Sequence, residues 1–159
     1  MNVICFHDPE GENGYLSNLY TVTFEIEGSE FSSVEKYMMY EKARAFGDED
    51  IAAKILRTDD PVETKALGRQ VKNYDDRLWN GIRQIVVWRG LQAKFGQHPS
   101  IAALLLATGD SLLAECDGPN NLIWGCGLEM GDPRSMTPDE WPGLNMLGYT
   151  LMELRKDLR

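Results

Sequence analysis

The sequence has few of the residues that build metal sites and disulfide frameworks. Its 159 residues include two histidines and three cysteines, and no His or Cys pair has the spacing of zinc ligands. Cys5, Cys116 and Cys126 form no CxxC pair, cannot all pair within one chain and stand among apolar residues, so reduced thiols are expected. We expect neither a metal site nor another bound cofactor.

Long apolar runs are also missing. No stretch approaches the roughly 20 uninterrupted apolar residues that a membrane helix requires. The beginning of the chain, Met1 to Asp8, lacks the basic segment and apolar run of an export signal. The sequence therefore predicts a cytoplasmic protein without a membrane segment.

Positive charge is scarce overall. The net charge is −9, which argues against a protein that binds a long duplex through many phosphate contacts, because Lys and Arg supply that binding. Seven basic residues and two acidic ones nevertheless lie between Lys65 and Lys94. This stretch is either a solvated helix face, which is the commoner case, or a local phosphate-binding patch.

Motifs of several enzyme classes are absent. Gly11-Glu12-Asn13-Gly14 lacks the Lys-Ser/Thr of a P-loop, and no GxGxxG opens a helix after a strand. There is no GxSxG elbow either. The sequence therefore excludes nucleotide binding by a P-loop or by a GxGxxG motif. It contains no motif that indicates acyl transfer.

The patterns that are present predict one domain over residues 1–159, mainly helical and of the α+β class, with a small β-sheet. The longest helical pattern should turn Leu78, Ile82, Ile85, Val86, Leu91 and Phe95 toward a core. Helices are expected over residues 33–46, 48–56, 60–71, 76–96, 98–107 and 147–158, and strands over residues 2–7, 22–26, 112–116 and 122–124.

Glu35 and Lys42 lie on one face of the first predicted helix, since they are seven residues apart. A carboxylate and an ammonium could thus line one pocket. The local alternative for Glu35 is a capping box with Ser32, in which the carboxylate bonds the start of the helix. Lys42 could equally be a solvated lysine.

The sequence contains further polar and aromatic residues that a hydrophobic core alone would not require. Each of them could nevertheless have a purely structural role. The tryptophans Trp79 and Trp124 are more often core or rim residues than stacking platforms. Asn18 and Asn145 could be simple turn residues. Individually these signals are weak.

In chain order, a set of short motifs resembles the NADAR superfamily, whose YbiA-like members are small single domains, and the resemblance covers nearly the whole chain. The motifs are Gly14-Tyr15-Leu16-Ser17-Asn18, Phe31-Ser32-Ser33-Val34-Glu35-Lys36-Tyr37, Glu41-Lys42-Ala43, Leu67-Gly68-Arg69, Trp79, Ala93-Lys94-Phe95, Leu105-Leu106-Ala107-Thr108-Gly109, Ile123-Trp124-Gly125 and Gly143-Leu144-Asn145-Met146-Leu147-Gly148.

This resemblance implies an N-glycosidase that hydrolyses phosphorylated ribosyl compounds, either riboflavin-pathway intermediates or ADP-ribose attached to guanine bases. It assigns catalytic roles to Glu35 and Lys42. It assigns substrate binding to Asn18, Arg69, Trp79, Trp124, Gly125 and Asn145.

Two departures from the family pattern bear on substrate preference. Many relatives have His where this chain has Lys36, and some have Asp where it has Cys126. Neither change removes Glu35. A pocket of altered polarity would accept a different base.

Two other function classes remain open from the sequence. One is a non-catalytic module that binds NAD- or ADP-ribose-like ligands, and the other is an interaction protein whose acidic surface docks on a partner. An enzyme would act on a phosphorylated ribosyl molecule or an ADP-ribosylated nucleic-acid base. The sequence does not determine the oligomeric state.

Overall fold

The structure is a computed structural model that describes residues 1–159. It divides into two compact units, one formed by residues Thr21–Gln97 and the other by Met1–Tyr20 together with His98–Arg159. Six α-helices and four short strands make it a mainly helical α+β fold, as predicted. One domain over residues 1–159 stays a prediction. In neither unit is any helix both long and apolar enough to cross a membrane.

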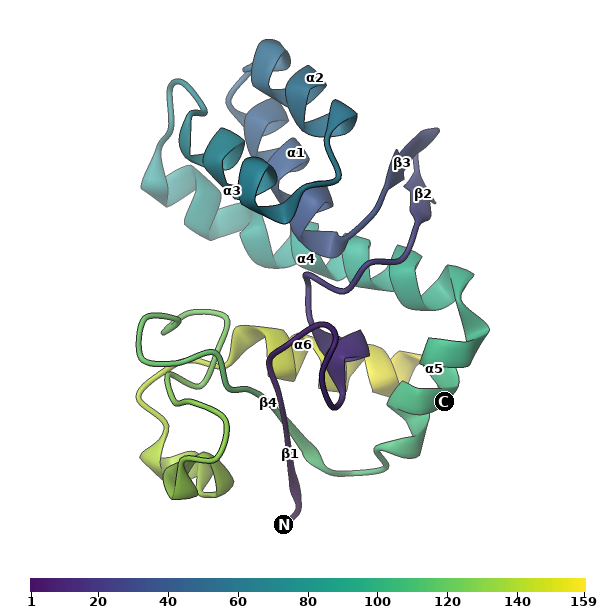
Figure 1. Cartoon of the computed structure of the whole chain (residues 1–159), viewed down its shortest axis with the longest axis vertical. Coiled ribbons are helices and arrows are strands. Elements are labelled where there is room, and N and C mark those ends of the chain that lie inside the picture. Colours follow the sequence, from purple (N-terminus) through teal and green to yellow (C-terminus); the bar gives the residue numbers. More distant parts are fainter. The chain divides into compact units, whose positions relative to one another are not determined.

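The Thr21–Gln97 unit begins with a hairpin and continues with four helices (Figure 1). The antiparallel pair places Phe24 opposite Phe31, and both rings pack against Tyr37. The second strand was not predicted, because its first residue reads as part of the turn. The elements are β2 (Phe24–Ile26), β3 (Ser29–Phe31), α1 (Val34–Ala45), α2 (Glu49–Arg57), α3 (Pro61–Arg69) and α4 (Asp76–Gln97).

The start of α1 differs from the predicted capping box. The N-cap is Ser33, whose hydroxyl accepts a hydrogen bond from the backbone N–H of Lys36. Ser32 instead hydrogen-bonds Asp59. Glu35 is therefore the second residue of the helix, one position too early for a capping box.

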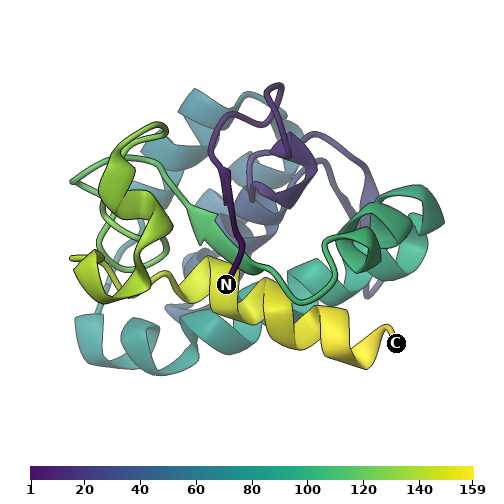
Figure 2. The same cartoon turned by 90° about the horizontal axis from the view of Figure 1, so that it is seen from below.

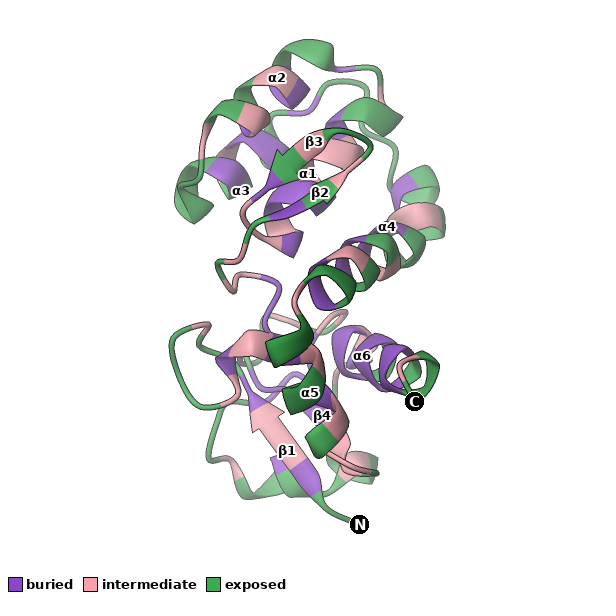
Figure 3. Cartoon of the chain, turned by 90° about the vertical axis from the view of Figure 1, so that its right-hand side faces the viewer, coloured by how far each residue is buried: buried purple, intermediate pink, exposed green.

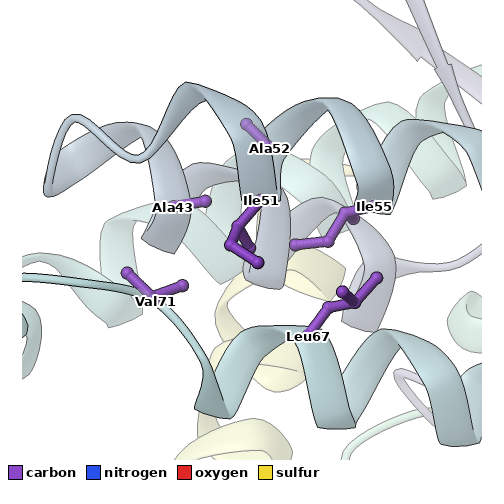
Figure 4. Packing of buried hydrophobic residues seen from close by; sticks show 6 residues of the cluster. All are labelled: Ala43, Ile51, Ala52, Ile55, Leu67 and Val71. Carbon is purple, nitrogen blue, oxygen red and sulfur yellow. The ribbon is translucent and has the colours of Figure 1, made fainter.

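A small apolar core joins α1, α2 and α3. Asp48 caps α2, and Asp60 followed by Pro61 begins α3; both helices begin within one residue of the predicted positions 48 and 60. The side chains that meet between the three helices are Ala43, Ile51, Ala52, Ile55, Leu67 and Val71 (Figure 4). This core holds α3 against α1, which fixes the distance between the polar residues that the two helices carry.

The long helix α4 also packs on α1. A Cβ at Gly90 would lie 2.9 Å from Cδ1 of Tyr37, so only glycine allows this approach. The predicted core face is partly wrong: Val86, Leu91 and Phe95 are buried, but Leu78 is 46% and Ile85 62% exposed. Figure 3 shows buried and exposed segments alternating along α4. Its buried face is shifted, and additionally carries Trp79, Val87, Gly90 and Lys94.

The other unit is organised by a parallel pair of strands, β1 (Val3–Phe6) and β4 (Leu112–Glu115), with Val3 opposite Leu112. A parallel pair requires a long connection, which explains why its strands come from distant parts of the chain. The long helix α6 lies along β4 (Figures 1 and 2). The remaining elements are η1 (Gly14–Leu16), α5 (Pro99–Ala107), η2 (Pro133–Met136), η3 (Pro138–Glu140) and α6 (Met146–Asp157).

The strand predicted over residues 122–124 is wrong, because this segment is an irregular loop. Its backbone carbonyls are used by the start of α6: Met146 N–H donates to Ile123 at 3.0 Å and Leu147 N–H to Trp124 at 3.1 Å. The free N–H groups of a helix start need such acceptors. The apolar run Leu122 to Trp124 thus forms a cap and no strand.

Candidate functional site

Glu35 and Lys42 lie on one face of α1 with Met39 between them, because positions 35, 39 and 42 are separated by four and three residues. All three side chains are half-buried. The predicted pairing of a carboxylate and an ammonium on one helix face is therefore present within the Thr21–Gln97 unit.

The helix α3 approaches this face closely at Gly68. A Cβ at Gly68 would lie 2.2 Å from Sδ of Met39, so the bare glycine brings the two helices together. Lys65 and Arg69 stand three positions before and one after Gly68, and both are exposed. The approach thereby adds two cations to the Glu35–Lys42 face.

The electrostatics of these groups are coupled. Burial raises the pKa of Glu35 above its usual value, and the positive charges of Lys65 and Lys42 offset part of that rise. Burial likewise lowers the pKa of Lys42, while Glu35 raises it and Arg69 lowers it further. The pKa values of this carboxyl and this ammonium are thus shifted toward each other, as in groups that transfer protons.

An aromatic ring fixes the position of the Lys42 ammonium. Its Nζ lies 4.7 Å from the centre of the Tyr74 ring, and this ring packs edge-on against Phe46. The Tyr74 hydroxyl donates a 2.6 Å hydrogen bond to Asp76. A cation over an aromatic face is attracted to it, so Tyr74 restrains the lysine beside Glu35.

Two further residues of this unit have structural surroundings. Trp79, near the start of α4, is only 6% exposed. Lys36 is buried, and its ammonium donates to the carbonyl of Leu56 at 3.2 Å and to Asp59 at 2.9 Å. Lys36 therefore binds the C-terminal end of α2, where a cation is favourable.

In the other unit, Asn18 follows the tight turn at η1. Gly14 is required there, since a Cβ would lie 2.3 Å from the carbonyl oxygen of Pro9. Asn18 is 7% exposed, and its Oδ1 has no hydrogen-bond partner in the protein. A buried amide oxygen without a donor is costly, and a ligand that supplies an N–H or O–H would relieve that cost.

Asn145 occupies the open edge of β4. Its Nδ2 donates to the carbonyl of Leu113 at 2.8 Å, and its Oδ1 accepts from the N–H of Glu115 at 3.1 Å. The side chain is fully buried. The amide thus pairs with β4 as a neighbouring strand would.

The loop before α6 carries Trp124 and Gly125. Trp124 is half-buried. Gly125 is buried, and a Cβ there would lie 2.9 Å from the Glu115 carbonyl and 3.0 Å from that of Asn121. Gly125 therefore contributes by its lack of a side chain, which lets the loop that presents Trp124 lie against the end of β4.

Comparison with known proteins decides the family. A model of the NADAR domain matches residues 5–159. The chain belongs to the NADAR family. It is 36% identical to N-glycosidase R617 of Acanthamoeba polyphaga mimivirus over 89% of this chain and 85% of that protein. It is 31% identical to N-glycosidase YbiA of Escherichia coli K12 over 98% and 88%.

Structure comparison agrees with the sequence. The solved structure of Escherichia coli YbiA superposes with a TM-score of 0.80 at 31% identity, covering 99% of this chain and 84% of that one. The riboflavin biosynthesis protein VVA0006 of Vibrio vulnificus is 31% identical over 98% of this chain, which corresponds to 38% of that protein. These relatives place the chain among the enzymes named N-glycosidases.

In this NADAR chain the structure also adds candidate residues that sequence reasoning missed. Lys65 acts on Glu35, and its signal was present, since it begins the basic stretch. Gly68 lay inside the motif Leu67-Gly68-Arg69 without an assigned role. Tyr74 had no local signal, because its position over Lys42 depends on the fold of the loop before α4.

Proposed function

We propose that this protein hydrolyses an N-glycosidic bond in a phosphorylated ribosyl compound, with Glu35 as the catalytic carboxylate. The observation that carries the proposal is the Glu35 carboxyl on α1, half-buried, with a raised pKa and coupled to Lys42 and Lys65. We expect this site to act without a metal or another cofactor.

The chemistry of the bond explains the need for such a carboxylate. Departure of a nitrogenous base from ribose builds positive charge on C1 and the ring oxygen. A fixed negative charge beside C1 stabilises that transition state more than the neutral ground state. A carboxylate whose pKa is raised can also take the proton of the attacking water.

The cations have a separate task in this proposal. The Lys42 ammonium lies over the Tyr74 ring and interacts electrostatically with Glu35. Three roles are open to it: it protonates the leaving nitrogen, binds the phosphate, or condenses with the opened sugar aldehyde to an imine with loss of water. Arg69 and Lys65 on α3 are exposed and free to bind phosphate oxygens, for which the guanidinium fork is well suited. The basic stretch would then serve a phosphorylated small molecule, without any role for a long duplex.

The predicted binding residues of the other unit are given different weights. The buried Oδ1 of Asn18, which lacks a donor, is proposed to accept a hydrogen bond from the substrate. Trp124 retains exposed surface and is proposed as a stacking face for a base or ribose, worth about 1 to 3 kcal/mol per stacked base. Trp79, Gly125 and Asn145 are proposed as positioning residues.

Two substrate classes satisfy this chemistry: ribosylamino phosphates of the riboflavin pathway, and ADP-ribose linked to guanine. The name of the Vibrio vulnificus relative supports the first class. Both present ribose C1 bonded to a base nitrogen together with phosphate, so the same carboxylate and cations would serve either one.

The alternative is a non-catalytic module that binds NAD- or ADP-ribose-like ligands. It would be favoured by a Glu35 held in the helix cap. Because the Ser33 hydroxyl caps α1, this argument for the module is lost, and the hydrolase is the better account of Glu35.

The test is hydrolysis of three substrates, a riboflavin-pathway ribosylamino phosphate, NAD, and ADP-ribosylated guanine in single-stranded DNA. Glu35→Gln should lose at least about a hundredfold in rate while staying folded. The matched control is Glu41→Gln. Glu41 is a half-buried carboxylate on the same helix whose pKa is also raised by burial but which is coupled to Arg89 and Arg44, so this variant should retain its rate. Binding without base release by the native protein would establish the module instead.

A further inference from the structure

The three cysteines, which have no role in the proposed hydrolysis, form one cluster in the unit that contains β1 and β4. All three are free thiols, and they pack together with Val3, Ala114 and Leu128. The Sγ atoms of Cys116 and Cys126 lie 3.7 Å apart. This separation is a non-bonded contact, well beyond the roughly 2.05 Å of a disulfide.

The strand register brings Cys5 to the same cluster. Cys5 lies opposite Ala114 in the parallel pair, and Cys116 follows two residues later, so its side chain points to the same face. A hydrogen bond links the thiols of Cys5 and Cys116. Cys116 therefore stands between Cys5 on one side and Cys126 on the other.

Only one of the three thiols has a route to solvent. Cys116 and Cys126 are buried, whereas Cys5 is half-buried and lines a cavity of about 360 Å³. The cavity is open to solvent and is formed by β1 and the segment Met130–Met136. Ser135 is one of its walls, with Oγ 3.5 Å from the Cys5 Sγ. A small reagent that enters the cavity meets Cys5 first.

The surroundings of Cys5 and Cys116 shift the pKa values of the two thiols in opposite directions. Hydrogen bonding from Cys116 lowers the pKa of Cys5 to about 6, with a further contribution from Ser135 against the opposing effect of burial. The hydrogen bonds that Cys116 shares with Cys126 and Cys5 raise the pKa of Cys116. The thiolate is the nucleophilic form of cysteine, so the geometry and the ionisation select the same residue.

We propose that Cys5 is a site of oxidation by peroxides and that Cys116 is its resolving thiol. The Cys5 thiolate attacks hydrogen peroxide, the O–O bond breaks, and sulfenic acid and hydroxide form. The Cys116 thiol then attacks the sulfenic sulfur, giving the Cys5–Cys116 disulfide and water. Cys126, 3.7 Å from Cys116, can exchange into this disulfide and release the Cys5 thiolate. The oxidant is reduced and two thiols are oxidised.

The first experiment treats the full-length protein with hydrogen peroxide and identifies the modified cysteines by peptide mass spectrometry. We expect one intramolecular disulfide that includes Cys116. Cys5→Ser should lose free thiols at least about tenfold more slowly. Cys116→Ser should accumulate sulfenic acid on Cys5, detected with dimedone. In Cys126→Ser, the control, oxidation of Cys5 and its resolution by Cys116 should persist.

Two results would overturn the proposal: a disulfide that forms at an unchanged rate in Cys5→Ser, or the absence of sulfenic acid from Cys5 in Cys116→Ser. Because a substitution of the buried Cys116 can impair folding, the native protein provides a second measurement. Brief alkylation with iodoacetamide should label Cys5 before either other thiol, and preferential labelling of Cys116 or Cys126 would contradict the assignment.

Discussion

Replacement of Asn145 distinguishes a residue that holds the fold from one that binds substrate. Asn145→Gly removes both side-chain hydrogen bonds and leaves the carbonyl of Leu113 and the N–H of Glu115 without partners. An unsatisfied buried polar group costs about 1 to 3 kcal/mol. We therefore expect Asn145→Gly to lower the free energy of unfolding by about 2 to 5 kcal/mol.

Asn145→Ala adds a second penalty that glycine avoids. The backbone φ of Asn145 is +50°, in the left-handed region, where alanine costs roughly 1 kcal/mol more than glycine. Asn145→Ala should thus be about 1 kcal/mol less stable than Asn145→Gly. Both variants lack the two hydrogen bonds, so the difference between their free energies of unfolding measures the backbone strain alone.

Urea unfolding followed by circular dichroism measures the free energy of unfolding of both variants. KM for the hydrolysed substrate is measured on the same proteins. If Asn145 is a positioning residue, both variants should be less stable than the native protein. The reasoning would be refuted by an Asn145→Gly protein within about 0.5 kcal/mol of the native stability whose KM has risen tenfold or more, because that combination identifies a substrate contact.

Three further predictions concern stability. Gly148→Ala should lower the free energy of unfolding in urea by about 3 kcal/mol or more, because its Cβ would lie 2.0 Å from the Leu113 carbonyl oxygen. Gly81 is exposed and a Cβ there would meet nothing within 4 Å, so the control Gly81→Ala should raise it by about 1 kcal/mol. Equal effects of the two substitutions would contradict this reasoning. Glu35→Gln should be more stable than the native protein at pH 7.5 and equal to it near pH 4. The raised pKa of Glu35 means that the folded state holds its proton more tightly, so native stability falls as pH rises from the ordinary carboxyl range through the folded pKa; a pH-independent difference would be inconsistent with that. Lys36→Met should lower the free energy of unfolding in urea by about 1 to 2 kcal/mol, since the Leu56 carbonyl loses its donor. Its kcat should be unchanged. A large fall in kcat would instead assign Lys36 to the candidate active site.

Three of the helices were predictable because each has a local signal at its start. Asp48 caps α2, Asp60-Pro61 begins α3 and Pro99 begins α5, and these residues act through hydrogen bonds and a fixed φ within a few positions of the chain. Such signals do not depend on tertiary structure. The boundaries derived from them agree with the structure to within about two residues.

The failures occur where a distant segment decides the local structure. The run Leu122 to Trp124 has the composition of a strand, but the N–H groups at the start of α6 bond its carbonyls. Along α4, Leu78 and Ile85 fit an apolar helical pattern equally well, yet the close approach at Gly90 rotates the buried face away from them. Neither tertiary contact leaves a trace in the local pattern.

Glu35 shows how one position in the sequence changes a functional conclusion. With Ser32 as the cap, its carboxylate would bond the helix start and have a structural role. With Ser33 as the cap, Glu35 is one residue closer to the helix start, and Ser32 is available to Asp59. The two serines are equally good caps by type. The choice depends on Asp59, 27 positions beyond Ser32 in the sequence, which bonds both Ser32 and the ammonium of Lys36. Through Asp59, the loop after α2 holds Ser32 and Lys36, three positions before and one after Glu35, while the Ser33 hydroxyl takes the place of Glu35 in the helix cap.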